Sequence, residues 1–465
     1  MVAVFDVVIL GAGSGGYACA LRAAQLGLTV ALIEKDKVGG TCLHRGCIPT
    51  KAILHAAEVA DTARDAAQFG VHATVDSVDL AAVRSYADGV VNRLYRGLTG
   101  LVSSRNITGI EGQGRLVPGD GGPLVQVGQE TFGSEYLVLA SGSYPRSLAS
   151  VPIDGVKVLT SDHAVRLETL PASAIVLGGG VIGVEFASAW RSLGVEVTIV
   201  EALSRLVPAE EPEVSAALQR AFRKRKIAVL AGSALEAFEA TATGVRVTLA
   251  SGTAVEAEIL LVAVGRGPAT DDLGCDEAGI QRERGWVSVT DRLQTSVPHV
   301  YAVGDIVAGP QLAHRGFAHG VFVAEDIAFR MGRSTSEPTP VNDHDVPRVT
   351  YSHPEIASVG LTEVAAREQY GEVETLVYDL SGNGKSQILK TQGFVKLIRR
   401  VSGAVVGVHM IGDRVSELVG EAQLITGWEA YAEDVASLIH AHPTQHEALG
   451  EAHLALAGQP LHTHG

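Results

Sequence analysis

Two cysteines five residues apart, Cys42 and Cys47, are the side chains best suited to redox chemistry in a sequence that contains only four cysteines. A disulfide needs Cα atoms about 4.4 to 6.8 Å apart, whereas residues five apart in an ideal helix are separated by roughly 8 to 9 Å. The chain must therefore bend between the two thiols, and Gly46 would permit the bend. The spacing is compatible with a redox pair.

The residues that follow Cys47 predict a helix that would activate it. Pro49 is tolerated in the first turn of a helix, and the run from Thr50 to Leu54 continues a helical pattern. The positive end of a helix stabilises an anion, so Cys47 would ionise readily when reduced. On these residues alone, two ordinary buried cysteines remain the alternative, because free cysteine is commonly buried.

A dinucleotide-binding unit lies just before the dithiol. The apolar strand Phe5 to Leu10 runs into Gly11, Gly13 and Gly16, and a helix through Leu26 and a strand ending at Glu34 follow. The first glycine makes a tight turn, the second lets the backbone approach a pyrophosphate, and the third lets the helix pack on the strand. The acid would hold a ribose hydroxyl. The pattern predicts a complete βαβ nucleotide unit.

The same unit recurs once, in register. Gly178, Gly180, Gly183 and Glu201 each lie 167 residues after Gly11, Gly13, Gly16 and Glu34, respectively. Such a register indicates an internal duplication and a second dinucleotide-binding domain. Two cofactors beside one dithiol imply an electron path.

With these motifs the sequence resembles the flavin-containing pyridine nucleotide-disulfide oxidoreductases, and within them the enzymes that oxidise dihydrolipoyl groups. The resemblance covers nearly the whole chain. It implies that the first unit binds FAD, that the second binds NAD, and that a Cys42–Cys47 disulfide relays electrons from dihydrolipoamide to the flavin. Cys42 would be the outer thiol that meets substrate, and Cys47 the inner thiol against the flavin.

The resemblance also implies the residues around each cofactor. The matched flavin residues are Gly11, Gly13, Gly16, Glu34, Thr41, Lys51, Gly114, Ser141, Gly142, Ser143, Asp305, Leu312, Ala313 and His314. The matched NAD residues are Gly178, Gly180, Gly183, Glu185, Glu201 and Gly265. Lys51 would pair with Glu185 near the flavin N5, and Asp305 would follow an apolar strand over residues 295–302. Residues 139–145 and 264–268 would be the two crossings between the nucleotide domains.

His442 is the candidate base. Histidine is well suited to taking a thiol proton near neutral pH. Pro443 would start a helix, which places Glu447 in an early turn, where it could orient the imidazole. The family resemblance matches this His-Pro-Thr run with Glu447 and implies that the base serves the dithiol of the other subunit of a homodimer. His440, His446 and His453 have no such match and are expected to be surface or packing residues.

Length and composition fit an α/β fold with several domains. A chain of 465 residues suggests about three domains of roughly 150 residues. We expect two Rossmann-like dinucleotide-binding domains plus a C-terminal α+β dimerisation domain. The expected boundaries are 1–150 for the first part of the FAD domain, 151–270 for the NAD domain, 271–345 for the return to the FAD domain and 346–465 for the dimerisation domain. A loop without a readable motif is expected over 117–134.

Charge and hydropathy narrow the class of protein further. The formal net charge of −15 argues against nucleic acid as a partner. No apolar run approaches 18 residues and the N-terminus lacks a basic leader, so we expect a soluble, cytoplasmic protein. In a reducing compartment a disulfide is more often catalytic than structural. The sparse C-terminal histidines show no metal spacing, and no metal is expected.

Three functions remain open at this stage. The favoured one is an NAD-dependent oxidation of dihydrolipoyl groups on an acyltransferase of a 2-oxo acid dehydrogenase complex or on a glycine-cleavage carrier. The second is an NADPH-dependent reductase of a small disulfide, which Glu201 disfavours although Arg205 lies nearby. The third is a non-catalytic docking subunit of an acyl-transfer complex. His44 and Arg45, where Asn-Val is frequent, and the altered run 315–319 depart from the usual family pattern near the dithiol and flavin.

Overall fold

The computed structural model describes residues 3–119 and 123–462. They divide into two compact units. The first unit spans 1–52, 81–146 and 266–343, and the second spans 53–80, 147–265 and 344–465. The second unit therefore contains both the residues expected to bind NAD and those expected to form the dimerisation domain.

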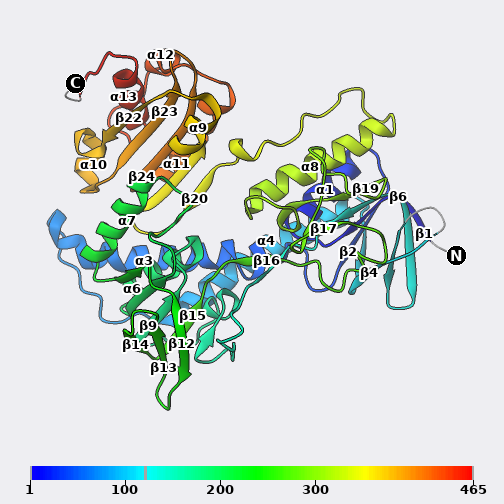
Figure 1. The fold of residues 1–465 in the computed structure, drawn as a ribbon, viewed down its shortest axis with the longest axis horizontal. Helices are drawn as coiled ribbons and strands as arrows, with labels where there is room; N and C mark the ends of the chain where they lie inside the picture. Colours follow the sequence, from blue (N-terminus) through cyan, green and yellow to red (C-terminus); the bar gives the residue numbers. More distant parts are fainter. Residues whose placement is uncertain (1–2, 120–122, 463–465) are drawn as a thin grey trace. The chain divides into compact units, whose positions relative to one another are not determined.

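A mostly parallel sheet forms the centre of the first unit (Figure 1). Its strands are β1 (Ala3–Leu10), β2 (Val30–Glu34), β3 (Thr108–Glu111), β4 (Gly114–Val117), β5 (Leu124–Val127), β6 (Glu130–Leu139) and β19 (Val300–Ala302), in the order β3-β2-β1-β6-β5-β4 with β19 beside β6. Val7, Val8 and Ile9 are fully buried, as expected for a strand covered on both faces. Helices α1 (Ser14–Gln25) and α8 (Ala313–Arg330) pack against each other.

The remaining elements of the first unit surround this sheet. They are α2 (Gly40–His44), the start of α3 (Cys47–Asp65), α4 (Leu80–Ser104), β7 (Ser143–Pro145), β16 (Arg266–Pro268), β17 (Arg282–Glu283) and β18 (Trp286–Val287). The expected outward and return crossings meet here, because β7 pairs antiparallel with β16.

The second unit repeats the nucleotide-binding architecture and adds a C-terminal sheet. Its parallel sheet has the order β11-β10-β9-β15-β8 and consists of β8 (Val158–Leu159), β9 (Ser173–Leu177), β10 (Glu196–Glu201), β11 (Ala228–Ala231) and β15 (Ile259–Val262). An antiparallel sheet of β12 (Leu235–Ala240), β13 (Val245–Leu249) and β14 (Ala254–Ala257) accompanies it. The helices are α5 (Ser161–Ala164), α6 (Val181–Ser192) and α7 (Pro212–Lys224).

The C-terminal part is an antiparallel sheet covered by helices, as expected for an α+β domain. Its strands are β20 (Arg348–Thr350), β21 (Glu355–Gly360), β22 (Val373–Asp379), β23 (Phe394–Arg400) and β24 (Val405–Gly412), in the order β20-β21-β24-β23-β22. Its helices are α9 (Glu363–Tyr370), α10 (Gly384–Leu389), α11 (Val415–Gly427), α12 (Ala432–Ala436) and α13 (Glu447–Leu456). Helix α11 packs on β21 and β24.

A buried ammonium joins the C-terminal sheet to α7 within the second unit. Lys396 on β23 is 2% exposed, and its Nζ lies 2.7 Å from Glu211, 2.8 Å from Glu213 and 2.8 Å from Glu363. These three carboxylates form the single acidic cluster with metal-ligand spacing among the described residues. The ammonium of Lys396 contacts all three carboxylates.

Two local expectations were wrong. The segment 117–134 is not a plain loop, because β5 and β6 form an antiparallel hairpin within its described residues. The strand expected over 295–302 forms only as β19, Val300–Ala302, because the preceding residues make turns.

No helix in the described part of the chain is long and apolar enough to cross a bilayer.

Candidate functional site

The dithiol lies where one short helix ends and a long one begins. Cys42 is in α2, Arg45 caps that helix, and Cys47 is the first residue of α3. The helix therefore starts earlier than the sequence predicted from Pro49. This places Cys47 even nearer to the unpaired backbone N–H groups that stabilise a thiolate.

Gly46 acts by close approach and not by an unusual backbone conformation. Its φ is outside the left-handed region. A Cβ at this position would lie 3.1 Å from the carbonyl oxygen of Thr41 and 3.4 Å from Cα of Cys42. The absence of a side chain at Gly46 thus lets the backbone there lie close to Thr41 and Cys42.

The two thiols are reduced and interact with each other. Both are half-buried. The hydrogen bond with Cys47 raises the pKa of Cys42, burial raises it further, and the ammonium of Lys51 acts in the opposite direction. Cys42 therefore holds its proton, which favours Cys47 as the thiolate of the reduced pair.

Residues between the two cysteines attach to the segment that follows β2. Nε2 of His44 lies 2.9 Å from the carbonyl oxygen of Val38, and its ring packs edge-on against Tyr95. Arg45 forms an ion pair with Asp36 at 3.1 Å. His44 and Arg45, which depart from the usual family pattern, thus attach the bend between the thiols to the segment after β2.

The first glycine loop has the shape that a dinucleotide needs. A Cβ at Gly16 would lie 1.8 Å from the carbonyl oxygen of Gly11, whereas one at Gly13 would meet nothing within 4 Å. Glu34 accepts hydrogen bonds from the backbone N–H of Ala12 at 2.7 Å and of Asp36 at 3.0 Å. The open space at Gly13, at the start of α1, is suited to a pyrophosphate.

Two predicted flavin residues, Ser143 on β7 and Asp305 on η2 (Gly304–Ile306), contact each other. Ser143 donates from its hydroxyl to Asp305 at 2.6 Å and accepts from Nε of Arg266 at 2.8 Å. Ser141 donates to the carbonyl oxygen of Ala269 at 2.7 Å. Arg266 is a member of this network that the sequence interpretation placed in the return crossing without a role.

The other predicted flavin residues lie on several elements of the first unit. Gly142 has a φ of +78° and open space where a Cβ would be, and Gly114 lies against the side chains of Leu10 and Ile33. Thr41 lies in α2, Leu312 caps α8, and Ala313 and His314 begin it.

One buried polar atom supports the fit of FAD to the first unit. Nε2 of Gln311 is buried and has no hydrogen-bond partner among the described residues. Gln311 directly precedes Leu312, the N-cap of α8. A cofactor carbonyl or phosphate oxygen would satisfy it.

The second glycine loop repeats the first. A Cβ at Gly183 would lie 1.9 Å from the carbonyl oxygen of Gly178, while Gly180 and Gly265 have open space. Glu201, 9% exposed, accepts from the backbone N–H of Gly179 at 2.5 Å and of Leu203 at 2.7 Å. These donors lie 167 residues after those that bind Glu34, so the duplication extends to hydrogen bonds.

Arg205 is engaged elsewhere and does not compete with Glu201. Its guanidinium donates to the carbonyl oxygens of Pro208 at 2.7 Å and Glu210 at 2.5 Å, and to the hydroxyl of Ser215 at 3.1 Å. The cation is used to hold the loop before α7. The second nucleotide site therefore presents a carboxylate where a 2′-hydroxyl would be read.

Glu185 is buried on α6, and the C-terminal part of its own unit orients it. Its Oε1 accepts from the backbone N–H of Tyr351 at 2.9 Å. One helical turn later, Ser188 accepts from the N–H of His353 at 2.9 Å. Pairing of Glu185 with Lys51 stays a prediction.

The candidate base and its carboxylate are in contact. Nδ1 of His442 lies 2.7 Å from Oε1 of Glu447, and Oε2 accepts from the N–H of Thr444 at 2.7 Å. Burial alone would raise the pKa of Glu447, but these hydrogen bonds lower it. The ionised carboxylate orients the imidazole. The helix begins at Glu447 and not at Pro443, because residues 442–445 form bends and residue 446 forms a turn.

Two histidines that were expected to be surface or packing residues instead share a carboxylate. His440 and His446 both contact Glu421, a residue that sequence reasoning missed. Nothing in the spacing signals this, because Glu421 lies on another helix, α11. His453 is fully buried, and burial lowers its pKa to about 4, as expected for a packing residue.

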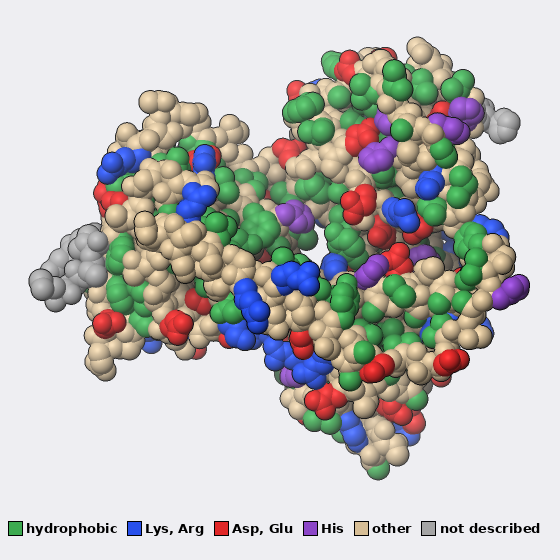
Figure 2. Space-filling model, turned by 180° about the vertical axis from the view of Figure 1, so that it is seen from behind, with side chains coloured by type: hydrophobic (Ala, Val, Ile, Leu, Met, Phe, Trp, Pro, Cys, Tyr) green, Lys and Arg blue, Asp and Glu red, His purple; other side chains and the backbone are tan. Residues whose placement is uncertain are grey.

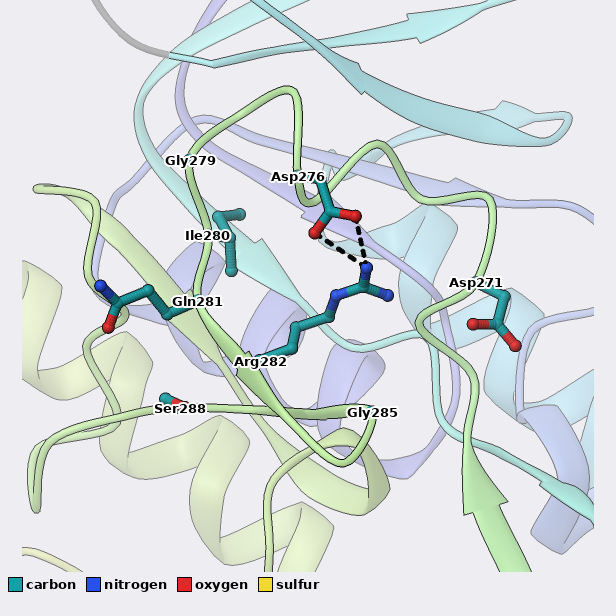
Figure 3. A pocket seen from close by; sticks show the side chains of 8 residues that line it. All are labelled: Asp271, Asp276, Gly279, Ile280, Gln281, Arg282, Gly285 and Ser288. Atoms are coloured by element: carbon teal, nitrogen blue, oxygen red, sulfur yellow. Dashed lines mark hydrogen bonds and ion pairs between the residues drawn. The ribbon is translucent and has the colours of Figure 1, made fainter.

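A surface pocket of about 780 Å³ lies apart from these residues. Figure 3 shows Arg282 in it, donating to both carboxylate oxygens of Asp276 at 2.8 Å. None of the sequence-predicted site residues lines this pocket. Its one cation is already neutralised by Asp276.

Comparisons with known proteins cover nearly the whole chain. Residues 5–320 match the family described as pyridine nucleotide-disulphide oxidoreductase, and residues 346–453 match its dimerisation domain. A dihydrolipoyl dehydrogenase of Bacillus subtilis is 39% identical, over 98% of this chain and 99% of that protein. The mitochondrial dihydrolipoyl dehydrogenase of Pisum sativum is 36% identical, over 98% and 92%.

Solved structures agree with these matches. The crystal structure of LpdA from Mycobacterium tuberculosis has a TM-score of 0.89 at 27% identity and covers 98% of this chain and 100% of that one. The Cu(II) complex of the HOCl-induced flavoprotein disulfide reductase RclA from Escherichia coli has a TM-score of 0.85 at 25% identity, with 98% and 100% coverage.

Proposed function

Because this chain belongs to the pyridine nucleotide-disulphide oxidoreductase family, we propose that it is a dihydrolipoyl dehydrogenase that uses FAD and reduces NAD⁺. The observation that carries the proposal is the contact at 2.7 Å between the exposed His442 and Glu447 at the start of α13, in a chain that also has the Cys42–Cys47 thiol pair. Exchange with an external dithiol needs such a base.

The dithiol and the base would act in two steps. With Cys42 and Cys47 joined as a disulfide, a dihydrolipoyl thiol loses its proton to His442 and attacks Sγ of Cys42, which releases Cys47 as a thiolate. The second lipoyl thiol then attacks the lipoyl sulfur of the mixed disulfide, and the bond from that sulfur to Sγ of Cys42 breaks. Cys42 leaves as a thiol with the proton that His442 held, the second lipoyl proton passes to His442, and the lipoyl group leaves as a cyclic disulfide. Two electrons have passed to the cysteine pair.

Local charge favours this outcome. The start of α3 and Lys51 stabilise negative charge at the pair, and the raised pKa of Cys42 keeps the proton on the outer sulfur. FAD, when bound, supplies a two-electron acceptor that links the dithiol to NAD⁺. Glu447 keeps the imidazole of His442 oriented between the two steps.

The partners follow from the same assignment. The dimerisation domain supports a homodimer, and His442 would serve the dithiol of the partner subunit. The substrate would be a lipoyl group carried by an acyltransferase of a 2-oxo acid dehydrogenase complex or by a glycine-cleavage carrier protein, and the site of action would be the cytoplasm.

A direct assay tests the reaction. Purified FAD-loaded protein should form NADH from dihydrolipoamide and NAD⁺, and should do so far more slowly with NADP⁺. If dihydrolipoamide yields no NADH while NADPH reduces a small disulfide such as that of glutathione, the reductase is the better assignment. If neither reaction occurs but the protein copurifies with a lipoyl-bearing assembly, the docking subunit is favoured.

Mixing two inactive variants tests where His442 acts. Cys47→Ser and His442→Ala homodimers should each lose most activity, since removing a positioned acid or base costs roughly 10² to 10⁴ in rate. After dissociation and random reassociation, a mixed dimer would contain one intact site and one doubly damaged site. Activity should return to about a quarter of wild type, which follows from two-fold symmetry. No recovery would mean that His442 serves its own chain.

A further inference from the structure

Glu421 joins the two ends of the segment that carries the candidate base. On α11, its Oε1 lies 2.8 Å from Nε2 of His440, and its Oε2 lies 2.9 Å from Nδ1 of His446. Each carboxylate oxygen therefore contacts a different imidazole. His442 lies between the two histidines in sequence.

The side chain of His442 is far more exposed than those of His440 and Glu421. The side chain of His442 is 77% exposed, whereas those of His440 and Glu421 are 11% and 22% exposed. An exposed side chain on bends and turns gains little positional restraint from packing around it. Its placement depends on where the backbone of the segment is attached. Glu421 binds His440 and His446. The carbonyl oxygen of Thr444 accepts from Asn383 at 3.1 Å, and the buried Gln445 accepts from Ser386 at 2.8 Å and donates to the carbonyl oxygen of Asp413 at 2.9 Å. Figure 2 shows exposed histidine side chains near the C-terminal end of the chain.

Helix α13 also leaves space for this arrangement. A Cβ at Gly450 would lie 2.5 Å from Nδ1 of His440 and 2.9 Å from Cε1 of the same ring. The absence of a side chain at position 450 lets the imidazole of His440 lie against α13 while its other nitrogen reaches Glu421. The contact between His440 and Glu421 therefore depends on a residue of α11, Glu421, and on a residue of α13, Gly450.

We propose that Glu421, by holding His440 and His446, is a positioning residue that fixes the loop carrying His442 for proton transfer. The proposal rests on the function proposed above. Glu421 has no role in the chemistry itself. Glu447 sets the orientation of the imidazole of His442, and Glu421, together with the hydrogen bonds of Thr444 and Gln445, sets the position of the backbone from which that imidazole projects.

The charges around Glu421 support an ionised carboxylate. Burial would raise the pKa of Glu421, but the hydrogen bonds from His440 and His446 lower it. The same hydrogen bond raises the pKa of His440 against the effect of burial, and Glu447 acts in the same direction. The remaining titratable neighbour is the buried His453, whose lowered pKa keeps it neutral.

Substitution at Glu421 tests the proposal. Glu421→Ala should lower the rate of NAD⁺ reduction by dihydrolipoamide about 10- to 100-fold, because a misplacement near 1 Å can cost about 10²-fold. Oxidation of NADH by ferricyanide, which needs no base at the dithiol, should stay within about twofold of wild type. Glu421→Gln, which can still bind both rings, should restore most of the lost rate.

A second glutamate–histidine pair, compared through the same conservative substitution as Glu421→Gln, shows what the loss of such a charge costs outside the loop. Glu451 on the same helix as Glu447 also binds a histidine, because it accepts from Nδ1 of His462 at 2.8 Å, but that histidine lies outside the loop. Glu451→Gln should keep the dihydrolipoamide rate within about twofold. An equal loss in both reactions for Glu421→Ala would overturn the proposal in favour of a structural role.

A double-mutant cycle identifies the residue through which Glu421 acts. If Glu421 acts only by placing His442, then adding Glu421→Ala to His442→Ala should cause no further loss in rate. Independent, multiplying losses would overturn the proposal. Wild-type activity in Glu421→Ala would also overturn it, whereas an inactive wild type would instead refute the proposed function.

A second variant perturbs the contact without removing the carboxylate. Gly450→Ala places a methyl group against the ring of His440, while alanine favours the helix itself. A melting temperature at or above that of wild type with a slower dihydrolipoamide reaction would support positioning. An unchanged rate in both Gly450→Ala and Glu421→Ala would refute it.

Discussion

The choice between NAD and NADP should depend on one carboxylate. Glu201 is buried and accepts two backbone hydrogen bonds, so its negative charge is held at the end of β10. Two unit charges about 4 Å apart interact by roughly 4 kcal/mol at an effective dielectric constant near 20. Since about 1.4 kcal/mol corresponds to tenfold in affinity, a 2′-phosphate should be disfavoured about 10²- to 10³-fold.

The test is Glu201→Gln, which removes the charge and nearly preserves the shape. The ratio of kcat/KM for NAD to that for NADP, measured with dihydrolipoamide at fixed ionic strength, should fall by about 10²-fold. Part of the change should be a higher KM for NAD, because the glutamine amide can accept only one of the two backbone hydrogen bonds.

Two controls use the internal repeat and the nearby arginine. Glu34→Gln changes the equivalent carboxylate of the first unit, so FAD retention should weaken while the nucleotide preference stays the same. Arg205→Met should leave the preference unchanged, because the guanidinium is bound to backbone carbonyls. Equal wild-type turnover with both nucleotides, or an unchanged ratio in Glu201→Gln, would refute this electrostatic reasoning.

Three further outcomes are expected. Anaerobic two-electron reduction should produce a long-wavelength charge-transfer absorbance that Cys47→Ser abolishes and Cys42→Ser retains; an FAD-loaded wild type without the band would contradict the electron path. Gly183→Ala, whose Cβ would lie 1.9 Å from a carbonyl oxygen, should abolish NADH binding in a fluorescence titration while the bound-flavin absorbance stays normal. Lys396→Met should lower the free energy of unfolding, measured in urea near neutral pH, by about 3 to 5 kcal/mol. Because Lys396 lowers the pKa of Glu363, that stabilisation is present above the unfolded pKa and is lost as pH falls through the folded one, so wild type and variant should converge in acid.

The sequence alone was sufficient for the features that depend on local geometry. The glycine loops were predicted because Gly16 and Gly183 must approach a carbonyl oxygen closely, which no side chain permits. The acids at the ends of β2 and β10 followed from the same motif. The fold class and the family followed from this duplicated pattern together with the dithiol.

Element boundaries were predicted less well, because the signals for helix starts are weak. Proline is compatible with several positions in a first turn, so Pro49 did not show that α3 begins at Cys47. Pro443 equally gave no sign that the chain continues in bends and a turn until Glu447. These starts depend on which backbone and side-chain hydrogen bonds form in the folded chain.

Contacts between distant segments were decided only by the tertiary structure. Arg205 was ambiguous in sequence, and only its hydrogen bonds show that it is bound to the loop before α7. Glu421 carried no motif at all, because its two histidine partners lie 19 and 25 residues further along the chain. Spacing along a chain determines which residues share a turn or a strand face, but the packing of helices and sheets determines which distant side chains meet.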